Sequence, residues 1–210
     1  MGTVAALYVE EGGVYSLDGV DVWGVSRDAR LYPGPHPVVA HPPCERWGRY
    51  WSGGPSHHGT RLKGNDGGCF AAALHSVRMW GGVLEHPADS IAWDWHGLIK
   101  PSRSGGWSHA DGHGWACCVE QGWYGHQAKK RTWLYAVRCE LPSLRWGSAP
   151  VGAGTNADAP ANTAEERAKL IKRGVTENLS KQQRSRTPGP FASLLITMAR
   201  GVQPATKDAQ

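Results

Sequence analysis

Residues 69–87 read CFAAALHSVRMWGGVLEHP, a helical pattern followed directly by a strand pattern. Along residues 69–80, apolar side chains recur at helical spacing on one face: Phe70, Ala73, Leu74, Val77 and Trp80. This spacing predicts a helix over residues 69–80, and Gly81-Gly82 is expected to end it. Val83 and Leu84 then begin a strand that finishes at a Glu-His-Pro turn.

On both sides of this unit, short apolar runs predict further strands at residues 4–9, 20–25, 38–40, 115–119 and 132–137. Strands that alternate with a helix are typical of an α/β fold with a mostly parallel sheet, because crossover helices connect parallel strands. Two long glycine-rich loops, over residues 48–68 and 94–114, interrupt the pattern. Long loops in compact domains are usually functional.

The composition changes after Trp146. Residues 148–162 are rich in Ala, Gly, Pro and Asn, which is typical of a linker. Thr163 and Glu166 form a Thr-x-x-Glu capping pattern for a helix, basic residues follow, and residues 191–200 predict a last helix. The sequence therefore predicts a domain over residues 1–147, a linker over 148–162 and a basic helical tail over 163–210.

Charge and cysteine usage bound the class of protein. The chain has 210 residues and a net charge of +5, which permits a polyanionic partner without requiring one. Five cysteines, and a beginning that lacks the pattern of a signal peptide, predict reduced thiols in a cytoplasm. No run approaches the roughly 18 apolar residues that a membrane span needs, so we expect no membrane partner.

Three short motifs follow one another along the chain, each at the end of a predicted strand or the beginning of one. They are Pro42-Pro43-Cys44, Glu85-His86-Pro87 and the run from Tyr124 to Arg131, YGHQAKKR. Each motif alone is a weak signal, because a strand-end acid or a Pro-Pro-Cys turn arises easily by chance. The three in this order, with a helix between the first two, are much more specific.

This order resembles that of the cytosine-5 DNA methyltransferases. Those enzymes carry a Pro-Pro-Cys loop, a helix, a strand ending in Glu-Asn-Val, and then Tyr-Gly-x-x-Gln-x-Arg-x-Arg before another strand. Here Lys129 replaces the first Arg, one residue is missing between Gly125 and Gln127, and His86-Pro87 replaces Asn-Val. The match covers about residues 38–137 and implies a methyltransferase-like, Rossmann-like sheet.

The resemblance implies a chemistry for the motif residues. A Cys44 thiolate would add to carbon 6 of cytosine, and the resulting enamine could attack an electrophile through carbon 5. Glu85 would donate a proton to ring nitrogen 3, for which a pKa raised by burial is favourable. Lys129 and Arg131 would hold the base carbonyl or nearby phosphates and help lower the thiol pKa. The remaining expected substrate contacts are Pro42, Pro43, His86 and Gln127.

The same resemblance implies S-adenosylmethionine as the methyl donor. Tyr8, Gly12 and Gly13 correspond to the glycine-rich first turn of the family, and Asp28 is the one acid near the expected ribose position. Arg27 is an unusual neighbour for such an acid, and the chain from Tyr32 to Cys44 is too short for the further strand and helix of the family. We therefore expect cofactor binding to be weaker than is usual in the family.

DNA is the expected partner, with the tryptophan-rich loops around Cys44 and at residues 93–115 clamping a flipped or single-stranded base. About 50 residues replace the family's separate recognition domain, so sequence specificity is expected to be low or supplied by a partner protein. Small methyltransferase-like proteins of this kind suggest a bacteriophage or prophage in a bacterial host. One alternative is a pyrimidine-modifying enzyme that uses another electrophile, and a second is a non-enzymatic DNA-binding or decoy descendant.

Structural interpretations compete with each site residue. Cys44 could be a buried structural thiol, Glu85 could cap a turn, and residues 129–131 could be a solvated charge run. A zinc site at His109, His113, Cys117 and Cys118 is disfavoured, because adjacent cysteines on a strand point to opposite faces. We therefore expect no metal.

Overall fold

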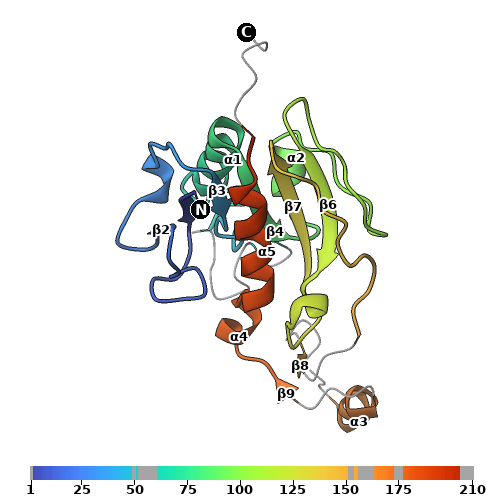
Figure 1. Cartoon of the computed structure of the whole chain (residues 1–210). Coiled ribbons are helices and arrows are strands. Elements are labelled where there is room, and N and C mark those ends of the chain that lie inside the picture. The colour runs from blue at the N-terminus through green and yellow to red at the C-terminus, as the bar shows by residue number, and fades with distance from the viewer. Residues whose placement is uncertain are drawn as a thin grey trace.

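The computed structural model describes residues 2–48, 51, 61–150, 154–155, 163–172 and 177–203. A sheet of seven strands in the order β2-β1-β3-β4-β7-β6-β5 forms its centre (Figure 1). The strands are β1 (Val4–Leu7), β2 (Val20–Trp23), β3 (Val38–Ala40), β4 (Gly82–Pro87), β5 (Ser108–His109), β6 (Trp115–Glu120) and β7 (Arg131–Val137). The predicted α/β class and all the predicted strands are therefore confirmed, with ends that differ by up to two residues.

The expectation of a mostly parallel sheet is wrong, because only one half of it is parallel. Strands β2, β1, β3 and β4 pair in parallel, whereas β7 is antiparallel to both β4 and β6, and β5 is antiparallel to β6. The connection explains the difference. Between β6 and β7 the chain has only the short helix η2 (Gln121–Tyr124) and a turn, and so short a connection cannot cross over to a parallel neighbour.

Helices cover both faces of the sheet. On one face, α1 (Cys69–Trp80), η1 (Ala29–Leu31) and α2 (Ala92–Trp95) pack against side chains such as Ala5 and Leu7. On the other face, α5 (Gly189–Arg200) crosses the strands and packs against their alternate residues, including Val4 and Ala6 (Figure 1). The bounds of α1 match the prediction. At the start of the following strand, only glycine fits at position 82, because a Cβ atom there would lie 1.9 Å from the Val38 carbonyl oxygen.

The C-terminal part holds more structure than the sequence predicted. The capping box is confirmed, since Thr163 and Glu166 exchange side-chain-to-backbone hydrogen bonds of 3.1 and 3.2 Å at the start of α3 (Ala164–Lys172). Within the polar basic stretch lies the short helix α4 (Lys181–Ser185). Two residues of the predicted linker form β8 (Gly154–Thr155), which pairs with β9 (Glu177–Asn178). Residues 151–153 and 156–162 of that linker lie outside the described residues.

The last helix is part of the core of the sheet domain. Phe191 and Leu195 of α5 are fully buried against β1, β3 and β4. Among the described residues, no helix is long and apolar enough to cross a membrane.

Candidate active site

The first two motifs meet at the end of the sheet where the parallel strands finish. Strands β1, β3 and β4 are parallel, so their carboxyl ends lie together, and β7 begins at the same edge because it runs the other way. The chain places β2 on one side of β1 and β3 on the other, which makes the gap between β1 and β3 a topological switch point. Ligands of open α/β sheets bind at such points, and residues 41–44 begin there.

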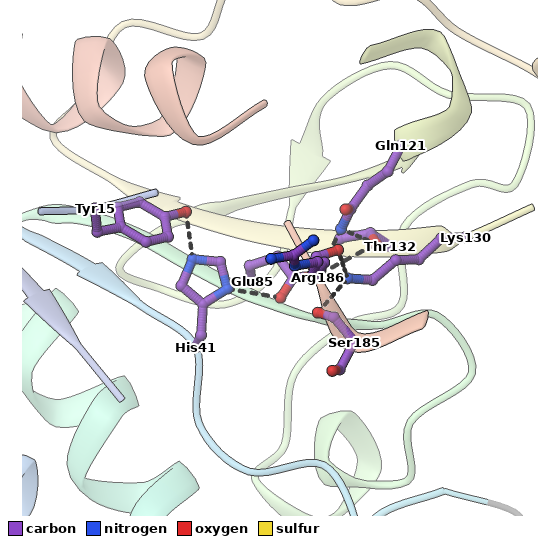
Figure 2. Close-up of polar contacts among 8 residues, drawn as sticks. All are labelled: Tyr15, His41, Glu85, Gln121, Lys130, Thr132, Ser185 and Arg186. Carbon is purple, nitrogen blue, oxygen red and sulfur yellow. Dashed lines mark hydrogen bonds and ion pairs between the residues drawn. The ribbon is translucent and has the colours of Figure 1, made fainter. Parts of the chain in front are cut away.

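The register of β3 and β4 brings His41 beside Glu85. Ala40 pairs with Leu84, so the residues that follow are neighbours. His41 Nδ1 lies 2.9 Å from Glu85 Oε2, and His41 Nε2 lies 2.6 Å from the hydroxyl of Tyr15 (Figure 2). The other carboxylate oxygen, Oε1, accepts hydrogen bonds from Gln121 Nε2 at 2.9 Å and Thr132 Oγ1 at 3.2 Å. All these side chains are buried or nearly so.

The expected rise in the Glu85 pKa is contradicted by its surroundings. Burial alone would raise the pKa of this carboxyl, but the hydrogen bond from His41 and the positive charge of Lys130 outweigh burial and lower it to about 2. Glu85 is therefore a carboxylate at neutral pH. It cannot hold the proton that nitrogen 3 of a pyrimidine needs.

Cys44 lies close to this network on an exposed turn. Desolvation of the thiol and the negative charge of Glu85 raise the pKa of Cys44, while Lys130 acts in the opposite sense. The expected lowering of the thiol pKa is therefore also wrong for the protein without substrate. The charge effects nevertheless show that Cys44, Glu85 and Lys130 share one site. In the same turn, Pro42 is buried and Pro43 is exposed.

His86 points to the opposite face of β4. It is fully buried and packs edge-on against Phe70, with ring centroids 5.1 Å apart. Burial lowers the pKa of His86 to about 4, so its ring is neutral at pH 7. Neither ring nitrogen meets hydrogen-bond geometry with a described residue, although the backbone of Pro43 is close enough to offset part of that shift. The structure thus places His86 beneath the Pro-Pro-Cys turn, on the face of β4 opposite Glu85.

The third motif contributes a residue that the sequence did not single out. Lys130 donates hydrogen bonds to the carbonyl oxygens of Ser185 and Arg186, at 3.1 and 3.0 Å (Figure 2). Its positive charge also lowers the pKa of Glu85 and of Cys44. Arg131 alternates to the other face of β7, where its Nε is 3.8 Å from Glu120 Oε1. Gln127 and Lys129 are exposed. Of the expected contacts from this motif, none forms a described bond with Glu85.

The expected cofactor residues lie around the ends of β1 and β2. A shallow pocket there is lined by Tyr8, residues 24–30 and Cys69, whereas Gly12 and Gly13 are not among its lining residues. Asp28 Oδ1 accepts from the backbone N and Nε of Arg30, at 3.0 and 2.8 Å. Its Oδ2 accepts from Nε and Nη2 of Arg30, at 3.1 and 2.6 Å. A carboxylate offers about four acceptor positions, and Arg30 takes up three of them with its backbone N–H, its Nε–H and one Nη2–H.

This pocket does not fit the ribose of S-adenosylmethionine as it stands. The two ribose hydroxyls need two acceptor positions, and the hydrogen bonds from Arg30 leave only one on Asp28. One polar atom at the pocket does lack a partner, the hydroxyl of Tyr8, which is buried without a hydrogen bond to any described residue. No step below depends on this cofactor.

Two expectations about other groups can be compared with the structure. Cys117 and Cys118 do face opposite sides of the sheet, in the α5 and α1 layers respectively. In the part of the chain that is described, no three His, Cys, Asp or Glu side chains are grouped to hold a metal ion.

Comparison with known proteins adds no assignment, since no family model matches this chain and no curated protein matches it. The site therefore has to be interpreted from its own geometry. Besides Lys130, sequence reasoning did not single out four residues of this network: Tyr15, His41, Gln121 and Thr132. Only His41 carried a signal, because it directly precedes the Pro-Pro-Cys motif at a strand end.

Proposed function

We propose that this chain modifies carbon 5 of a pyrimidine base in DNA, most simply cytosine, through a covalent adduct with Cys44. The observation that carries the proposal is that an exposed cysteine, a buried carboxylate and a lysine, from three separate motifs, act on one another at a topological switch point. Ligands bind at such switch points, and a Cys44 thiolate must lie where a base can bind if it is to attack the face of the ring.

The chemistry follows from the ring. Carbon 5 of cytosine is a poor nucleophile until sulfur adds to carbon 6 and nitrogen 3 takes up a proton. The enamine then attacks an electrophile through carbon 5, the carbon-5 proton leaves to a base, and elimination of the thiolate restores the ring. Methylation by S-adenosylmethionine is the simplest version. The ion pair of Asp28 with Arg30 favours the second version, in which another electrophile is used.

DNA as the substrate is supported by where basic residues lie. Lys130 donates a hydrogen bond to the carbonyl oxygen of Ser185 at the end of α4, and His126 Nε2 lies 3.3 Å from the Arg184 carbonyl oxygen. Two basic stretches that are distant in sequence, residues 129–131 and 184–186, therefore lie side by side next to Glu85. Phosphates of a strand that carries an extruded base would find cations on both stretches.

The decisive experiment requires no knowledge of the electrophile. In D₂O, the enamine formed by Cys44 can take deuterium at carbon 5, and elimination then leaves a labelled base. Single-stranded DNA incubated with the protein should gain one mass unit per exchanged cytosine, read by mass spectrometry of its nucleosides. Cys44→Ala should abolish the exchange, while Cys117→Ala, at a buried thiol on β6, should retain it. No exchange in cytosine or uracil DNA with the wild-type protein would refute the proposal.

A further inference from the structure

We propose that His41, oriented by Tyr15, supplies the proton that ring nitrogen 3 of the base takes up, with Glu85 passing it on. This inference rests on the proposed function and assigns roles to two residues, one at the end of β3 and one in the loop between β1 and β2. The geometry is a continuous chain, with 2.6 Å between the Tyr15 hydroxyl and His41 Nε2 and 2.9 Å between His41 Nδ1 and Glu85 Oε2.

The acceptor positions of Glu85 define its role. Its Oε1 receives two donors, the Gln121 amide and the Thr132 hydroxyl, and is filled. Among the described residues, only His41 donates to Oε2, which leaves one position on this oxygen without a described donor. A substrate atom bound at that position and the His41 proton would both contact the same oxygen, Glu85 Oε2. The lowered pKa of Glu85 agrees with this arrangement, because the carboxylate has no proton of its own to give.

The protons balance if both ring nitrogens of His41 carry a proton at the start of the reaction. Its Nε2–H is donated to the Tyr15 oxygen and its Nδ1–H to Glu85. Cys44 first loses its thiol proton to solvent. As its sulfur then bonds to carbon 6, the Nδ1 proton of His41 moves to Glu85 Oε2, and Oε2 passes that same proton to nitrogen 3. His41 is left neutral and Glu85 is again a carboxylate. Elimination of the thiolate returns the proton by the same path.

The charged and titratable groups that face His41 are those of Glu85, Tyr15, Cys44, His86 and Lys130. Glu85 is the carboxylate in contact with it, and Tyr15 is buried with a pKa raised well above 10, so it stays neutral. Cys44 is neutral until it reacts, His86 is neutral on the other face of β4, and Lys130 offsets part of the charge of Glu85.

Two variants separate proton supply from simple positioning. In His41→Asn the side-chain amide can still donate to Glu85 from about the place of Nδ1, but it has no proton to give up. Tyr15→Phe keeps the imidazole and removes the group that orients it. His75→Asn, on the exposed side of α1, is the matched control.

Carbon-5 exchange in D₂O gives the kinetic readout. His41→Asn should slow exchange about 100-fold at unchanged apparent affinity for DNA, and should remove the loss of rate that accompanies rising pH in the wild type. Tyr15→Phe should slow it about tenfold. His75→Asn should match the wild type. If Glu85→Gln abolishes exchange while His41→Asn keeps the wild-type rate and pH profile, the inference is wrong and the proposed function stands.

Nuclear magnetic resonance of the imidazole nitrogens tests the inference without substrate. With ¹⁵N-labelled histidine, the signal missing from His41→Asn identifies residue 41. The wild type should carry a proton on both nitrogens of this ring. A neutral His41 would overturn the inference even if exchange is observed, because the proposed transfer starts from the doubly protonated ring. Absence of exchange in the wild type would remove the proposed function and the inference with it.

Discussion

Glu85 and His86 are neighbours on β4, but their side chains point to opposite faces of the strand and have different surroundings. Both are buried on β4, yet Glu85 faces a set of hydrogen-bond donors and His86 faces the rings of Phe70 and Trp93. The donors lower the pKa of the carboxyl to about 2, and burial among the rings lowers the pKa of the imidazole to about 4. Near pH 7 the first residue is charged and the second is neutral.

The neutral His86 should make the protein lose stability on mild acidification. Its pKa is about 4 when folded and near the ordinary histidine value of 6.5 when unfolded, so the unfolded chain alone binds a proton as the pH falls from 6.5 toward 4. We expect His86 to account for a loss of about 2 kcal/mol between pH 7 and pH 5. Urea unfolding at both values should show this difference shrinking in His86→Phe and unchanged in His75→Asn. An equal loss in His86→Phe would contradict the assignment.

Glu85 affects the stability of the protein over a different range of pH. Its folded pKa lies below the unfolded value of 4.5, so the stability that it contributes is present above pH 4.5 and is lost as the pH falls from there toward 2. The range between pH 7 and pH 5 therefore reports mainly on buried histidines. His96 and His126 add to the loss with the same sign, because burial lowers the pKa of each.

Cys44 should be the one cysteine required for chemistry. DNA that contains 5-fluorocytosine should become covalently attached at Cys44 in the presence of the correct electrophile, since fluorine cannot leave carbon 5 as a proton does. Peptide mapping by mass spectrometry should place the adduct on the peptide containing residue 44. Cys44→Ala should form none, and Cys117→Ala should form the wild-type amount. Activity retained in Cys44→Ala but lost in Cys117→Ala would show that the motif was misassigned.

At the scale of elements, local patterns predicted helices and strands well. The bounds of α1 and β3 follow from helical spacing, from Gly81-Gly82 and from a short run of β-branched residues, all of which act within a few residues. Strand direction could not be predicted in this way. The antiparallel insertion of β7 between β4 and β6 depends on which strands meet in space, and an apolar run looks the same in either direction.

The site was predicted only where motifs carried it. Cys44 and Glu85 were singled out through the resemblance, and the charge of Lys130, from the third motif, lowers the pKa of both groups against the effect of burial. Gln121 and Thr132 could not be found, because the pairing of β4 with β7 and the fold of η2 bring them to Glu85 across 36 and 47 residues. The signs of two pKa shifts were also wrong, since each depends on neighbours from other elements.

The end of β2 and the start of η1 determine whether S-adenosylmethionine can bind. Arg30 occupies Asp28, so we expect the wild type to bind the cofactor weakly, at submillimolar concentrations or above. Arg30→Met should free the carboxylate and tighten binding about tenfold, since a bond to a charged acceptor is regained. Adding Asp28→Ala to Arg30→Met should cancel the gain. Calorimetry with the cofactor and its demethylated product measures all three, and micromolar wild-type binding that survives Asp28→Ala would contradict this account.

At the scale of the whole molecule, the fold gathers positive charge at one end of the sheet. The beginning of β7 and the end of α4 are joined by Lys130, which places residues 129–131 beside residues 184–186. The carboxyl ends of β3 and β4 lie at the same end and carry Cys44 and Glu85. Arg138, by contrast, follows the opposite end of β7 and is bound to the Met79 carbonyl oxygen.

DNA binding should therefore be strongly dependent on salt and weakly dependent on sequence. Phosphate contacts release counterions, and each contact to single-stranded DNA adds about 0.7 to the slope of log affinity against log salt. Removing one charge, as in Lys129→Gln or Arg186→Gln, should lower that slope by about this amount for every sequence tested. Arg138→Gln removes a charge from the other end of β7 and should leave the slope unchanged. Fluorescence anisotropy titrations between about 50 and 200 mM salt measure it, and tight, salt-insensitive binding to one short sequence would show that base contacts rather than phosphate contacts dominate.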